Sequence, residues 1–163
     1  MRGLAGERRW RESFLVAMVP QAVLGALLGL LWWLLAPKPE ARYLGLFWYA
    51  ESNQGFSAAQ DVLFGLVTVV PGIVVGVLLT LWSARPGAGR RLTAWLGGAV
   101  AGSLVCWMTG CLLGHGFASY APGAVAPAPL TLTSYGLLAV WPAAAAFAVT
   151  LALMGKGLFS SRW

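Results

Sequence analysis

Residues 62–82 read VLFGLVTVVPGIVVGVLLTLW, a run of 21 residues without a charged side chain. The hydrocarbon core of a bilayer is about 30 Å thick, and a helix needs about 20 apolar residues to cross it. The only side chains in this run that can form hydrogen bonds in the membrane, apart from its final tryptophan, are the hydroxyls of Thr68 and Thr80. The run therefore predicts a transmembrane helix.

Three further uncharged runs of similar length lie at 14–36, 92–113 and 135–154. Hydrophobic residues make up 59% of the chain and charged residues 10%. A typical soluble domain has about 45–50% and about 25%, so too little charge is present to cover a soluble surface. We expect an all-α integral membrane protein with four transmembrane helices. The first run is too long for a secretory signal core and carries Trp32 and Trp33 near its end, so we expect it to remain as a span.

The basic residues predict the orientation of these spans, because cytoplasmic loops carry an excess of Lys and Arg. Nine of the eleven fall on one side: Arg2, Arg8, Arg9, Arg11, Arg85, Arg90, Arg91, Lys156 and Arg162. The other side has Lys38 and Arg42. We therefore expect both termini in the cytoplasm and the protein in a bacterial plasma membrane. Topology also explains the net charge of +6, and no nucleic-acid partner is expected.

The same pattern divides the chain into five segments. We expect a basic cytoplasmic tail at 1–13, a first two-helix unit at 14–83 with an outer loop at 37–61, and a cytoplasmic turn at 84–91. A second two-helix unit at 92–155 contains an outer loop at 114–134, and a cytoplasmic tail follows at 156–163. The first outer loop is rich in aromatic residues, and short strands at 43–49 and 130–133 are one possibility for these loops.

The two units share landmarks that predict an internal repeat. Gly25 and Gly29 correspond to Gly98 and Gly102, 73 residues later, and Pro71 corresponds to Pro142, 71 residues later. A repeat of two spans preserves orientation. The pseudo-twofold axis would then run along the membrane normal, as in transporters built from parallel repeats.

Small residues recur every fourth position in the third run, and residues at this spacing share one helix face. They allow helix backbones to approach closely in lipid. Two interpretations stay open, namely packing within the bundle and a docking face for another membrane protein. The residues concerned are Gly25, Gly29, Gly72, Gly76, Gly98, Gly102, Cys106 and Gly110.

Pro71 and Pro142 each remove a helical hydrogen bond, so we expect paired kinks. No Asp, Glu, Lys, Arg or His lies near the middle of any span. Proton-coupled transport and intramembrane hydrolysis usually need such a group, and its absence argues against both.

The remaining polar candidates, Asp61 and His115, lie at the outer ends of the second and third runs. An Asp–His pair could bind a metal or move a proton. Asp61 could equally interact with the helix dipole at the start of its span, and His115 could be an interface residue. No second His or Cys stands at ligand spacing, so no catalytic site, metal or cofactor is expected.

The chain resembles a family of small actinobacterial membrane proteins classed as a domain of unknown function. The resemblance rests on Gly25 and Gly29, on GFSAAQD at 55–61, on APLTL at 128–132, and on Gly136 with Trp141 and Pro142. It covers residues 14–155. It implies four spans in an actinobacterial plasma membrane and supplies no activity.

Together these patterns favour a non-enzymatic accessory or scaffold subunit that packs against a larger membrane complex. The expected partners are membrane lipids and either a membrane protein or further copies of this chain. The alternative is a small transporter or lipid-binding component with a site between the two repeats.

Overall fold

The computed structural model describes residues 2–46, 48–49, 53–82, 88–115 and 120–160. Within the helices it describes only the backbone of residues 2–13, 53–55, 82, 88, 90–91, 115 and 156–160. Arg85 and Arg162 of the basic set, and residues 84–87 of the expected turn, lie outside the described residues.

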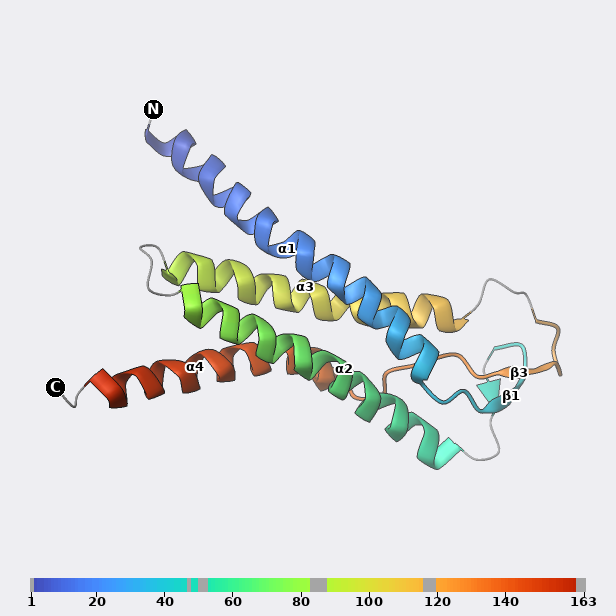
Figure 1. Ribbon diagram of the computed structural model, residues 1–163. Coiled ribbons are helices and arrows are strands. Elements are labelled where there is room, and N and C mark those ends of the chain that lie inside the picture. Colours follow the sequence, from blue (N-terminus) through green and yellow to red (C-terminus); the bar gives the residue numbers. More distant parts are fainter. Residues whose placement is uncertain (1, 47, 50–52, 83–87, 116–119, 161–163) are drawn as a thin grey trace.

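Four long helices dominate the fold (Figure 1). They are α1 (Arg2–Leu35), α2 (Asn53–Trp82), α3 (Ala88–His115) and α4 (Val140–Ser160), and a short 3₁₀ helix, η1 (Tyr135–Ala139), precedes α4. The segments long and apolar enough to cross a membrane are Phe14–Leu35, Phe56–Leu81, Leu92–Gly114 and Tyr135–Gly155. The prediction of a mainly helical chain with four such segments is confirmed.

The helices extend beyond the predicted spans. α1 begins at Arg2, so most of the segment expected as a basic tail is helical. Arg and Glu are good helix formers, and they can lie outside the hydrocarbon while continuing the helix. α2 begins at Asn53, within the expected outer loop, and α4 continues to Ser160.

The helices pack mainly as two pairs, α1 with α3 and α2 with α4. Gly25 lies against Gly102, and Gly29 lies against Cys106. Gly72 and Gly76 lie against Trp141 and Ala145 in the same order. In both pairs higher residue numbers meet higher residue numbers, so the paired helices run in the same direction.

Both termini therefore lie at one end of the bundle, and both long loops lie at the other (Figure 1). We name these the termini end and the sheet end. At the sheet end the loops join in a three-stranded antiparallel sheet with the order β2-β1-β3. The strands are β1 (Glu40–Tyr43), β2 (Trp48–Tyr49) and β3 (Val125–Pro127). The first two fall largely where strands were considered; residues 130–133 are not a strand.

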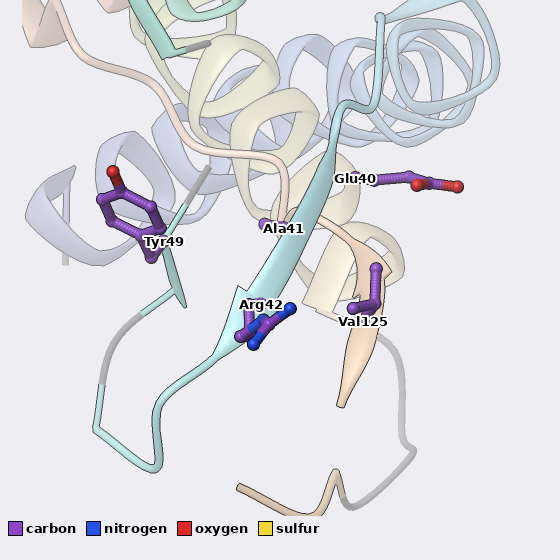
Figure 2. A pocket seen from close by; sticks show the side chains of 5 residues that line it. All are labelled: Glu40, Ala41, Arg42, Tyr49 and Val125. Carbon is purple, nitrogen blue, oxygen red and sulfur yellow. The ribbon is translucent and has the colours of Figure 1, made fainter. Parts of the chain in front are cut away.

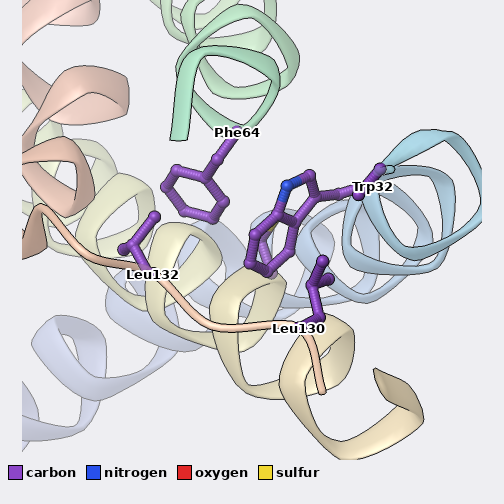
Figure 3. Close-up of a cluster of buried hydrophobic side chains, with 6 residues drawn as sticks. Trp32, Phe64, Leu130 and Leu132 are labelled. Carbon is purple, nitrogen blue, oxygen red and sulfur yellow. The ribbon is translucent and has the colours of Figure 1, made fainter. Parts of the chain in front are cut away.

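A hydrophobic core lies beneath the sheet (Figure 3). Trp32 of α1 and Phe64 of α2 are 0% exposed, and their rings meet edge to face with centroids 5.0 Å apart. Leu130 and Leu132 from the loop before η1 complete this core, together with Ala36 and Cys106. The loop between α3 and α4 is thus packed as part of the bundle.

Candidate functional site

The glycines of α1 and α3 lie in the contact between these two helices. A Cβ atom on Gly25 would overlap the carbonyl oxygen of Gly102, and one on Gly29 would overlap that of Cys106. On the α3 side, a Cβ on Gly98 would meet Gln21, and one on Gly110 would meet the ring of Trp32. The chain itself therefore occupies this glycine face.

The glycines of α2 are used in the same way. A Cβ on Gly72 would lie 2.6 Å from the carbonyl oxygen of Trp141, and one on Gly76 would lie 2.5 Å from that of Ala145. Distances this short do not occur between real atoms, so only glycine permits such close helix contact. The glycine stripes singled out in the sequence are internal contacts.

Pro71 and Pro142 occupy unlike positions. Pro71 is a buried residue inside α2, where it removes one hydrogen bond of the helix. Pro142 is in the first turn of α4, directly after η1, where a backbone N–H has no helical acceptor in any case. A third proline, Pro20, lies inside α1. The two prolines expected as matched kinks thus differ in their effect on the backbone.

Gln21 is a buried polar residue of α1 that bonds to α3. Its Nε2 donates to the carbonyl oxygen of Trp95 at 2.9 Å and to that of Ala17 at 3.3 Å. Its Oε1, the Oγ of Ser103 and the Nε1 of Trp141 make no hydrogen bond among the described residues. These groups are neutral, so they provide no charged step for transport.

Trp32 and Gln60 join three segments at the sheet end. Trp32 Nε1 donates to the carbonyl oxygen of Gln60 at 3.0 Å, and Gln60 Nε2 donates to the carbonyl oxygen of Pro37 at 2.9 Å. These bonds tie α1, α2 and the segment before β1 together. Sequence reasoning did not assign a role to either side chain; the signal available was a polar Gln-Asp pair directly ahead of an apolar run.

Asp61 holds the loop that leads into η1. Its Oδ1 accepts a hydrogen bond from the N–H of Thr133, and its Oδ2 accepts one from the N–H of Ser134, both at 3.0 Å. Ser134 is the N-cap residue of η1, and its own side chain makes no capping bond. Asp61, 8% exposed, therefore places negative charge at the positive end of that helix, a favourable arrangement.

The Asp61–His115 hypothesis receives only part of an answer from this geometry. His115 is the last residue of α3, and its side chain lies outside the described part of the chain. Asp61 already uses both oxygens on backbone N–H groups. It caps η1, which belongs to another span, and lies well inside α2, which starts at Asn53. Among the residues searched, no group of three or more His, Cys, Asp or Glu could hold a metal.

Two hollows lie on the surface of the described chain. One, of about 430 Å³, is on the sheet and is lined by Glu40, Ala41, Arg42, Tyr49 and Val125 (Figure 2). The other, about 470 Å³, is an apolar groove between α1 and α2, lined by Leu24, Leu28, Leu31, Leu66, Val67, Val70, Pro71 and Val74.

Comparisons with protein-family models, with curated proteins and with solved structures give no match to this chain.

Proposed function

We propose that this protein is a non-enzymatic integral membrane subunit that packs against a larger membrane protein complex and stabilises or regulates it. In this proposal the termini end is cytoplasmic and the membrane is a bacterial, specifically actinobacterial, plasma membrane. The strong excess of basic residues on the side of the termini supports that orientation.

The observation that carries the proposal is the exposed tip of the β1–β2 hairpin. Leu46 is 95% exposed and Leu44 is 46% exposed, although both stand on a short turn that the sheet holds in place. Gly45, at φ +92°, makes this tight turn possible. Apolar side chains held out from a folded element are typical of sites that meet another protein.

The internal use of the polar and small residues also supports a structural role. Asp61, Gln60 and Gln21 bond to the backbone of this chain, and the glycines pack its own helices. These contacts build a bundle that positions the sheet. The sheet then presents the hairpin tip.

The internal repeat belongs to the proposal as well. Gly25 lies closest to Gly102, 77 residues along, whereas the landmarks differ by 73. Gly72 touches residues from Trp141 to Ala145, which agrees with the predicted offset of 71. An ancestral repeat with α3 shifted by about one helical turn, or 3.6 residues, would give both registers.

Co-purification from gently solubilised membranes tests the proposal. Replacement Leu46→Asp puts a charge into the proposed contact, and we expect recovery of the partner to fall at least about fivefold, since truncating a main contact residue costs more than about 1 kcal/mol. Thr131→Asp is the matched control, because Thr131 is exposed in the other loop at the same end. A chain that purifies alone, or equal recovery with both variants, would contradict the proposal.

The apolar groove supports a second candidate, a small transporter or lipid-binding component. The groove is lined by apolar side chains of α1 and α2 at membrane depth. It lies inside the first two-helix unit and contains Pro71, whereas the sequence suggested a site between the units beneath both prolines. Purification with bound phospholipid and without a protein partner would favour this candidate over the first.

A further inference from the structure

The face of the sheet that points away from the bundle carries two opposite charges side by side. β1 pairs with both other strands, and in the register Arg42 lies opposite Tyr49 on one side and opposite Val125 on the other. Glu40 lies two residues before Arg42. Side chains two apart on a strand share one face, so all four lie on the same side of the sheet.

The reverse face of the sheet is covered by the chain itself. Ala41 and Ala126, which alternate with the residues above, are buried, whereas Glu40, Arg42, Tyr49 and Val125 are exposed. These four residues surround the hollow of about 430 Å³ (Figure 2). An aromatic ring and an aliphatic side chain thus flank a guanidinium, with a carboxylate roughly 7 Å along the strand.

Glu40 and Arg42 are not joined by an ion pair in the part of the chain that the structure describes. The other basic residue of this end, Lys38, lies over the ring of Trp33, 4.6 Å from its centroid, and does not line the hollow. The hollow therefore offers one cationic and one anionic group, each open to a ligand.

We propose that this hollow binds a zwitterion that carries a phosphate and a primary ammonium group, as the ethanolamine phosphate headgroup of a phospholipid does. The guanidinium of Arg42 donates hydrogen bonds to the phosphate oxygens, a geometry that suits arginine. The carboxylate of Glu40 accepts from the ammonium, and the ring of Tyr49 supplies a face for the same cation. An anionic headgroup without an amine would leave Glu40 unpaired and repelled.

The position of the sheet supports the lipid as the source of this zwitterion. Glu40 follows the end of α1 at Leu35 by only five residues. The headgroup layers add about 10–15 Å to the 30 Å hydrocarbon core, counted over both sides. A sheet that starts so close to the end of a membrane-spanning helix lies beside that layer. The inference is independent of the accessory role, since it concerns the sheet face and not the hairpin tip.

Native mass spectrometry of the full chain tests the proposal. The chain is released from micelles that contain equal amounts of phosphatidylethanolamine and phosphatidylglycerol with identical acyl chains. We expect preferential retention of phosphatidylethanolamine. Arg42→Gln should weaken that retention about three- to fivefold, the range of an exposed charged contact, and Glu40→Gln should remove the preference over phosphatidylglycerol.

Lys38→Gln is the matched control, because it removes one positive charge from the same end outside the hollow. It should leave the preference unchanged. Equal retention of the two lipids by the wild-type chain, or an equal loss with Lys38→Gln and Arg42→Gln, would overturn the proposal.

A second arm uses O-phosphoethanolamine, which has no acyl chain. Weaker binding of this compound than of the lipid, at equal concentration, supports the membrane as the source. Binding as strong as that of the lipid, lost in Arg42→Gln, keeps the zwitterion site and makes a free solute its ligand.

Discussion

The two carboxylate oxygens of Asp61 accept hydrogen bonds from the N–H groups of two consecutive residues, Thr133 and Ser134. A buried carboxylate needs such partners, because an unpaired one would be costly away from water. At the scale of residues this contact fixes where the second loop joins the bundle. The sequence could not reveal it, since the partners lie 72 and 73 positions away and are backbone groups with no sequence signature.

Replacement Asp61→Asn should lower the free energy of unfolding by about 1.5–3 kcal/mol, the range for hydrogen bonds to a charged group. The amide keeps one acceptor oxygen and turns an NH₂ group toward an N–H donor. Equilibrium unfolding in mixed micelles measures the change. Glu40→Gln removes the same charge from an exposed position and should change stability by less than about 0.5 kcal/mol. Equal effects of the two variants would show that Asp61 does not hold the loop.

At the scale of elements, glycine contacts set how closely each helix pair packs. The spacing of Gly98, Gly102 and Gly110 predicts a face for close packing, but many helices could use such a face. The structure selects α1 as the helix that covers it. The choice depends on the complementary shape of α1, including Gln21 and Trp32, which no local pattern of α3 contains.

Gly25→Ala should destabilise the chain by about 1–3 kcal/mol, the usual cost of an overpacked contact. The new Cβ would overlap the carbonyl oxygen of Gly102, a backbone atom that cannot move alone. Unfolding in micelles again measures the effect. Gly155→Ala in α4 is the matched control, since no atom lies within 4 Å of its Cβ position, and alanine favours a helix. A stable Gly25→Ala variant would contradict the α1–α3 contact.

At the scale of the whole molecule, the sequence was sufficient for the helical spans and insufficient for the sheet. Apolar runs such as 62–82 must hide their backbone polar groups in lipid, and a helix does so within the run itself. The sheet depends on pairing between loops about 80 residues apart in the chain, such as Arg42 with Val125. Strands of two to four residues carry too weak a pattern to reveal such a pairing. The assignment of Trp32 to a core shared with Phe64 and Leu130 depends on the same long-range arrangement.

Thiol labelling of intact cells with a membrane-impermeant maleimide tests the topology most directly. Leu46→Cys places a thiol at the exposed hairpin tip, and Arg90→Cys places one near the start of α3 at the termini end. Wild-type chain should stay unlabelled, because Cys106 and Cys111 lie within the third candidate span. We predict that Leu46→Cys is labelled from outside and that Arg90→Cys is labelled only after permeabilisation. Labelling of Arg90→Cys in intact cells, with Leu46→Cys protected, would contradict the account.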